Sequence, residues 1–201
     1  MKLWHCRESR SLRPLWALEE MGMPYELAVL PFPPRVRHRE FLEINALGTV
    51  PYFEDGDVRM TESTGICHYL VEKYDRHEFG LRATEPEYGD YVNWLHHSDA
   101  TLTFPLTIVM RYRLMEPDRA PVAADDYAKW FLARLRLLDA RLVEGHEFLC
   151  GNRFTIADIA VTYALYLARY VGLADRLPAT ALGYLERMTQ RPAFVRANEV
   201  R

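Results

Sequence analysis

The segment from residue 45 to residue 74 constrains the fold of this chain more than any other. It contains a loop, a short strand entered through Val50-Pro51, a turn, a second short strand at 58–60, and a helix that begins near Ser63. Proline has no backbone N–H and holds the preceding residue extended, so a strand can begin at Pro51 only where the ladder needs no donor. The segment therefore predicts a β-turn-β-α unit with a corner at Val50-Pro51.

The same segment has features that suit a peptide ligand. X-Pro bonds at such corners occur in the cis form, and a cis bond would turn the Val50 N–H and C=O out of the sheet as a free pair. Ser63 and Thr64 open a helix whose first N–H groups favour an anion, and Glu62 beside them can accept a cation. A peptide with an amine and a carboxylate at one end would satisfy all three features, and γ-glutamyl-cysteinyl-glycine is such a peptide.

Two motifs far apart in the chain carry a family resemblance. Val50-Pro51 and Glu62-Ser63-Thr64 lie between N-A-L-G-T and I-C-H-Y-L-V-E-K-Y, and residues 154–158 are F-T-I-A-D. In isolation, Val50-Pro51 and Glu62-Ser63-Thr64 also fit a plain β-turn-β unit followed by a capped helix. With their spacing and the second motif, they resemble the cytosolic glutathione transferases over nearly the whole chain.

The predicted elements divide the chain into two domains. Residues 1–78 have the order β-α-β-α-β-β-α, which indicates a thioredoxin-like α/β domain whose first two strands are parallel. This order comes from a strand at 1–5, a helix from Ser11 to Gly22, a strand at 25–30, a short helix that the basic run at 35–39 enters and that ends near Asn45, and the unit described above. Residues 79–86 form the predicted linker. Residues 87–201 are expected to be an all-helical domain, and this layout is similar to the glutathione transferase fold.

Three long helices are expected in the second domain. The first covers residues 88–115 and should kink near Pro105, and the second covers 125–143. The third, at 156–171, has few charges, which is typical of a buried helix. Thr155 and Asp158 have the spacing of a capping box at its start.

Composition limits the classes of function. The chain has 201 residues, 49% of them hydrophobic, and a formal charge of −3, so it can bury a core and has no general attraction to nucleic acid. Its three cysteines, Cys6, Cys67 and Cys150, suggest neither a disulfide framework nor a metal site. The first ten residues lack the apolar stretch typical of a secretory leader, so we expect none, and no run approaches about 20 apolar residues. We therefore expect a soluble cytoplasmic protein without a metal, a membrane or a nucleic-acid partner.

The resemblance implies how a thiol would be activated. A thiol with a pKa of about 8.5 is mostly protonated at neutral pH, and the thiolate is the nucleophile. In the family, a hydroxyl at the start of the first helix donates to the sulfur. The segment S-R-S-L-R-P-L-W-A-L-E-E from residue 9 resembles bacterial and fungal members in which the first serine faces the thiol. This assigns Ser9, with Ser11 as second choice and Arg10 adding positive potential, whereas simple helix capping is the plainer role for both serines.

The resemblance also assigns residues that bind glutathione. It gives the backbone of Val50 to the cysteinyl unit, and Glu62 and Ser63 to the γ-glutamyl head group. The complete predicted binding set is Arg10, Thr49, Val50, Pro51, Glu62 and Ser63. Thr49 departs from relatives that have a long basic or amide side chain there, so the basic run at 35–39 is an alternative for the glycyl carboxylate.

The resulting prediction is a homodimeric glutathione transferase that conjugates glutathione to small hydrophobic electrophiles and also reduces peroxides. One alternative is a thiol-disulfide reductase, because Cys6 and Ser9 have C-x-x-S spacing. Two observations count against that role. No proline follows Cys6, and the gap between Cys6 and Arg13 puts Cys6 at the end of the strand rather than at the start of the helix. A second alternative is a non-catalytic scaffold with the same fold. Such proteins usually lose part of the head-group site.

Overall fold

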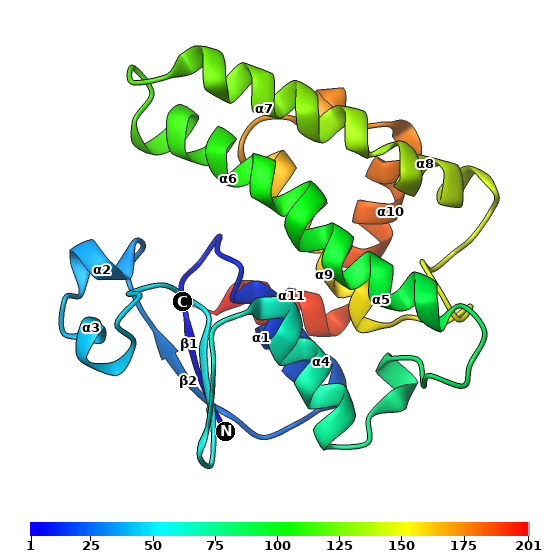
Figure 1. Ribbon diagram of the computed structural model, residues 1–201, viewed down its shortest axis with the longest axis horizontal. Coiled ribbons are helices and arrows are strands. Elements are labelled where there is room, and N and C mark those ends of the chain that lie inside the picture. The colour runs from blue at the N-terminus through cyan, green and yellow to red at the C-terminus, as the bar shows by residue number, and fades with distance from the viewer. Residues whose placement is uncertain (201) are drawn as a thin grey trace. The chain divides into compact units, whose positions relative to one another are not determined.

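The computed structural model describes residues 1–200, which form two compact units (Figure 1). The N-terminal unit contains residues 1–79 together with the segment that starts at Gln190. The helical unit contains residues 80–189. This grouping differs from the expected domains of 1–78 and 87–201 in two respects. The last helix belongs with the N-terminal unit, and residues 80–86 of the expected linker belong with the helical unit.

The N-terminal unit is built on a four-stranded sheet in the order β2-β1-β3-β4. The strands are β1 (Lys2–His5), β2 (Glu26–Val29), β3 (Tyr52–Asp55) and β4 (Val58–Met60). β1 pairs parallel with β2, in the register Leu3 to Leu27, and antiparallel with β3. The predicted parallel pair and the β-turn-β unit are both confirmed.

The helices of this unit follow the predicted order with one difference. They are α1 (Leu12–Met21), α2 (Pro34–Arg37), α3 (Phe41–Ile44), α4 (Ser63–Lys73), η1 (His77–Phe79) and α11 (Pro192–Glu199). α1 ends at Gly22, whose φ of 60° lets its N–H reach the last carbonyls of the helix. The predicted short helix ending near Asn45 is α3. The basic run before it forms a further short helix, α2, which His38 (φ −146°, ψ 72°) separates from α3.

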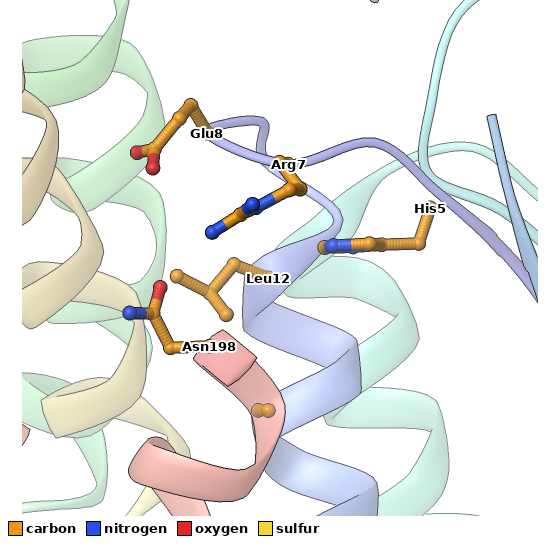
Figure 2. A pocket seen from close by; sticks show the side chains of 6 residues that line it. His5, Arg7, Glu8, Leu12 and Asn198 are labelled. Carbon is orange, nitrogen blue, oxygen red and sulfur yellow. The ribbon is translucent and has the colours of Figure 1, made fainter. Parts of the chain in front are cut away.

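β1 directs its side chains alternately to two faces of the sheet. Trp4 and Cys6 belong to a buried cluster with Phe41, Val50 and Tyr52. His5 lies between them in sequence and therefore projects to the opposite face. Figure 2 shows its ring directed toward the first turn of α1.

α11 is joined to α1 by an aromatic contact and two ion pairs. The rings of Trp16 and Phe194 meet edge to face with centroids 4.9 Å apart. Arg191 Nε lies 2.6 Å from Glu20 Oε1, and Arg196 lies at the same distance from a carboxylate oxygen of Glu19. These contacts explain why the C-terminal segment groups with the N-terminal unit.

The helical unit contains the long helices expected from the sequence, with different interruptions. Its elements are α5 (Tyr88–His96), η2 (His97–Thr103), α6 (Phe104–Met110), η3 (Arg111–Met115), α7 (Pro121–Arg134), α8 (Arg136–Val143), α9 (Ile156–Tyr170), η4 (Ala174–Arg176) and α10 (Ala179–Thr189). The run from 88 to 115 is continuous, but η2 and η3 are π-helical. Pro105, which lacks the N–H of a regular turn, directly follows the start of α6 after η2. The second predicted helix starts earlier, at Pro121, and breaks at Leu135.

α9 is the buried helix of this unit, and its predicted capping box is present. The Asp158 Oδ2 atom accepts a hydrogen bond of 2.8 Å from Thr155 N, and Thr155 Oγ1 accepts one from Ala157 N. Asp158 Oδ1 also accepts hydrogen bonds from Leu149 N at 3.0 Å and from the Tyr184 hydroxyl at 2.7 Å. Asp158 therefore caps α9 and also joins it to the segment at Leu149 and to α10.

Candidate functional site

The predicted site residues all belong to the N-terminal unit and occupy three places in it. Ser9, Arg10 and Ser11 form the turn between β1 and α1; Thr49, Val50 and Pro51 lead into β3; Glu62 and Ser63 start α4. Ser9, Ser11, Val50, Pro51 and Ser63 are buried, while Arg10, Thr49 and Glu62 are exposed. α1 packs against α4, which brings the first and third places to the same side of the sheet.

The two serines are hydrogen-bonded to each other and do not cap α1 in the usual way. The Ser9 and Ser11 hydroxyl oxygens are 2.7 Å apart. Ser9 Oγ donates to the Cys6 carbonyl at 2.7 Å, and Ser11 Oγ accepts from Cys6 N at 3.2 Å. Ser11 is the N-cap residue, yet its side chain makes no capping hydrogen bond. Ser9 Oγ accepts a longer hydrogen bond of 3.4 Å from Ser11 N, so the pair is bonded within the turn that leads into α1.

The two hydroxyls differ in exposure. Ser11 has no exposed surface, whereas Ser9 retains 6%. Of the two residues, only Ser9 therefore has surface in contact with solvent. Its position, in the turn before α1, is also close to the positive end of the helix dipole.

His5 completes this group and was not predicted from the sequence. Its Nδ1 atom lies 2.8 Å from Ser11 Oγ, and the side chain is buried. Burial lowers the pKa of His5 to about 4, although the hydrogen bond with Ser11 acts in the opposite direction. The imidazole is therefore neutral at pH 7. A histidine within an otherwise apolar strand was the signal available in the sequence.

Cys6 lies in a different environment from the serines. Its side chain is fully buried in the cluster formed with Trp4, Phe41 and Tyr52. Burial raises the pKa of the Cys6 thiol to about 12, so it remains protonated at neutral pH. Both findings count against a redox role for Cys6.

A second residue that was not predicted, Arg13 of α1, lies beside the start of α4. Its Nη1 atom donates a 3.0 Å hydrogen bond to Ser63 Oγ, and Arg13 has no exposed surface. Ser63 is the first residue of α4, and Glu62 precedes it in an extended conformation. A buried guanidinium beside the N–H groups of a helix start makes the local potential positive. Arg13 stands in the S-R-S-L-R motif, but the sequence did not indicate its burial.

The loop before β3 owes its shape to two residues of the N-A-L-G-T motif. Asn45 donates a 2.9 Å hydrogen bond from Nδ2 to the Thr49 carbonyl and accepts one from Leu47 N. Gly48 has a φ of 57°, and a Cβ there would lie 2.6 Å from Arg35 Cβ, so a larger residue would not fit. The loop therefore lies against the basic run at 35–39. The Val50-Pro51 peptide bond is cis.

Within residues 1–200, no group of three or more His, Cys, Asp and Glu side chains is arranged to hold a metal ion. In the same range, no helix is both long and apolar enough to cross a membrane.

Comparison with known proteins identifies the family. The profile described as "Glutathione S-transferase, N-terminal domain" matches residues 1–72, and "Glutathione S-transferase, C-terminal domain" matches residues 122–195. The chain belongs to the glutathione S-transferase family. This confirms the resemblance stated from the sequence and the fold of a thioredoxin-like domain followed by a helical domain.

Individual glutathione S-transferases resemble the chain over nearly its full length. It is 26% identical to Glutathione S-transferase 3 of Schizosaccharomyces pombe, covering 95% of this chain and 84% of that protein. It is 28% identical to Glutathione S-transferase GstB of Escherichia coli, covering 95% and 94%. Among solved structures, a sphingomonad glutathione S-transferase complexed with glutathione has a TM-score of 0.81 and 26% identity, covering 98% of this chain and 97% of that one.

Proposed function

We propose that this protein is a glutathione transferase whose Ser9 hydroxyl donates to the glutathione thiolate. The observation that carries the proposal is the Ser9–Ser11 pair, with oxygens 2.7 Å apart, at the start of α1. Ser9 keeps some exposed surface, and its proton can turn from the Cys6 carbonyl toward a sulfur. Donation to the anion lowers the pKa of the thiol and raises the fraction of nucleophile at neutral pH.

The start of α4 would hold the γ-glutamyl head group. The N–H groups at the positive end of the helix, the Ser63 hydroxyl and the buried Arg13 guanidinium suit its α-carboxylate. The exposed Glu62 carboxylate suits its α-ammonium group. This pairing of an anion site with a neighbouring cation site fits an amino-acid head group better than a simple anion.

The loop before β3 would hold the rest of the tripeptide. The backbone of Val50 pairs with the cysteinyl unit, and Thr49 and Pro51 flank it. The exposed Arg35, Arg37 and Arg39 lie on the segment against which this loop packs. These basic groups are our candidates for binding the glycyl carboxylate.

The reaction follows from the chemistry of the thiolate. Its sulfur forms a bond to an electrophilic carbon while the leaving group departs with its electron pair, and the thiol proton has already gone to solvent. We propose small hydrophobic electrophiles as substrates, glutathione-dependent peroxide reduction as an accompanying activity, and a cytoplasmic homodimer as the working form. The burial and raised thiol pKa of Cys6 argue against the reductase alternative. The intact head-group residues argue against a scaffold without catalysis.

Retention on immobilised glutathione, followed by assays with a panel of electrophiles and hydroperoxides, tests this function. Ser9→Ala should lower turnover at neutral pH, and much of the rate should return at alkaline pH, where the thiol ionises unaided. Ser98→Ala is a matched control, because it removes a buried serine hydroxyl from the helical unit. A Ser9→Ala enzyme with unchanged rates over the whole pH range would exclude Ser9 as the donor.

A further inference from the structure

His5, Ser11 and Ser9 form a chain of hydrogen bonds that ends at the proposed thiolate donor. The distances are 2.8 Å from His5 Nδ1 to Ser11 Oγ and 2.7 Å from Ser11 Oγ to Ser9 Oγ. We propose that His5 is a positioning residue: its Nδ1–H directs the Ser11 proton onto Ser9 and thereby leaves the Ser9 proton for the thiolate. This inference rests on the proposed function of Ser9.

Counting protons assigns the direction of each hydrogen bond. Each hydroxyl has one proton, and a carbonyl oxygen can only accept. The 2.7 Å bond to the Cys6 carbonyl therefore uses the Ser9 proton. The short contact between the two hydroxyls must then use the Ser11 proton, so Ser11 has none left for His5. His5 must donate to Ser11 from Nδ1.

The opposite tautomer would disable the donor. If Nδ1 carried no proton, Ser11 would donate to His5, and the 2.7 Å contact between hydroxyls would require the Ser9 proton. Ser9 would then have nothing to give to a thiolate. In the assigned arrangement Ser11 Oγ accepts from both His5 Nδ1 and Cys6 N, so all of its hydrogen-bonding capacity is used. The alternative Ser11 contact with the Cys6 carbonyl is longer, at 3.4 Å.

The surroundings of His5 are consistent with this tautomer. His5 lines a small cavity of about 10 Å³ together with Arg7, Glu8, Leu12, Ala197 and Asn198 (Figure 2). Arg7 and Asn198 carry N–H donors, which an unprotonated Nε2 needs, whereas the Glu8 carboxylate would suit a protonated Nε2. The lining thus allows the assigned tautomer, and the hydrogen bonds among His5, Ser11 and Ser9 select it. A cavity of this size holds about one water molecule, which can relay such a bond. Burial and the positive charge of Arg7 also keep the pKa of His5 low, so the ring is neutral.

Thiolate binding then requires only a rotation of one hydroxyl. The Ser9 O–H turns from the Cys6 carbonyl to the sulfur, while Ser11 continues to donate to Ser9. Every group keeps its own proton, and the proton of the thiol leaves to solvent. His5 touches neither substrate in this account and acts through Ser11 and Ser9.

The tautomer can be measured directly in the wild-type protein. Histidine labelled with ¹⁵N distinguishes a protonated from a bare ring nitrogen, and the His5 signal can be assigned through its own backbone. In protein saturated with glutathione at pH 8, we expect a protonated Nδ1 and a bare Nε2. A bare Nδ1 would overturn the proposal, whatever the behaviour of any variant.

Two variants test the consequence for catalysis. His5→Phe keeps a ring but removes the donor, whereas the side-chain amide of His5→Asn can donate from near the position of Nδ1. His5→Phe should raise the apparent pKa of bound glutathione by about one unit and lower kcat roughly tenfold at neutral pH, with the KM for glutathione within about twofold of wild type. In His5→Asn, the apparent pKa of bound glutathione and kcat should both return most of the way to the wild-type values. Equal losses of kcat in the two variants would show that His5 has only a structural role. A changed KM with an unchanged thiol pKa would show the same.

The Ser9→Ala background separates this inference from the proposed function. If Ser9 is the donor, Ser9→Ala raises the thiol pKa, and adding His5→Phe to it has no further effect. A thiol pKa unmoved by Ser9→Ala would defeat the proposed function. A pKa raised by Ser9→Ala but unmoved by His5→Phe would defeat this inference alone.

Discussion

Arg13 on α1 donates a 3.0 Å hydrogen bond to the hydroxyl of Ser63, the first residue of α4. Arg13 comes two residues after Ser11, which belongs to the proposed thiol site. Less than one turn of helix therefore separates that site from Arg13 and the proposed head-group site. Both Arg13 and Ser63 are buried. The hydrogen bond therefore fixes the position of one half of the proposed glutathione site relative to the other.

Arg13→Lys should weaken glutathione binding although it retains a positive charge. Lysine lacks the planar fork that lets one guanidinium group bond Ser63 and a carboxylate together. We expect the dissociation constant measured by calorimetry to rise at least about tenfold, the size of one charge-assisted hydrogen bond of about 1.5 kcal/mol. Arg10→Lys is the control, because Arg10 is exposed and belongs to the same motif. It should change the dissociation constant much less. An unchanged dissociation constant in Arg13→Lys would remove Arg13 from the site.

Ser63→Ala should have a similar effect on affinity for a different reason. It removes the hydroxyl that would meet the glutamyl carboxylate, and it also removes an acceptor of the Arg13 guanidinium. We expect binding to weaken at least about tenfold in calorimetry, since a charge-assisted hydrogen bond contributes about 1.5 to 3 kcal/mol. Unchanged affinity in the folded variant would exclude a contact between Ser63 and the ligand.

Local signals in the sequence were sufficient for most of the fold. Pro51 marked the corner before β3, Gly22 marked the end of α1, and the spacing of Thr155 and Asp158 marked the start of α9. Each signal acts through the backbone of its immediate neighbours. Such effects are encoded within a few residues and can be recognised without a structure.

The residues that were missed depend on contacts distant in sequence. Arg191 and Arg196 pair with acidic residues of α1, which no periodicity in the last helix indicates. Arg13 and His5 are polar residues whose importance follows from their burial. Burial is a property of the assembled sheet and helices, so a motif could suggest Ser9 but could not reveal the groups that orient it.

Cys6→Ala should leave glutathione-dependent turnover nearly unchanged. The thiol is buried in an apolar cluster and its pKa is raised to about 12, so it is neither accessible nor ionised. Mass spectrometry of wild-type protein incubated with oxidised glutathione should find no adduct on Cys6. An adduct there, together with loss of a reductase activity in Cys6→Ala, would restore the redox interpretation.

Asp158→Ala should destabilise the helical unit more than the loss of a helix cap does. Capping residues contribute about 0.5 to 2 kcal/mol, whereas Asp158 also accepts from Leu149 N and from the Tyr184 hydroxyl. Leaving these buried donors without an acceptor adds about 1 to 3 kcal/mol each before relaxation. Urea unfolding should detect the loss, and Tyr184→Phe, which removes one of these donors, should cost less. Affinity for glutathione should be unchanged in the folded fraction, so lost binding with normal stability would contradict a structural role.

The buried neutral state of His5 makes the stability of the protein depend on pH. The pKa of His5 is about 4 in the folded protein, against an ordinary value of 6.5 for histidine, so the unfolded chain binds more protons between these values. Stability contributed by His5 is therefore fully present above about pH 6.5 and is lost as the pH falls toward 4. At pH 5 the loss relative to pH 7 should be about 2 kcal/mol.

His5→Asn isolates this contribution, because asparagine does not titrate and other groups affect both proteins alike. Urea unfolding of both proteins at pH 7 and pH 5 should show that the free energy of unfolding falls less in the variant than in the wild type. Equal losses in the two proteins would mean that His5 titrates normally in the folded state, and a charged imidazolium would then stand beside the two serines below neutral pH.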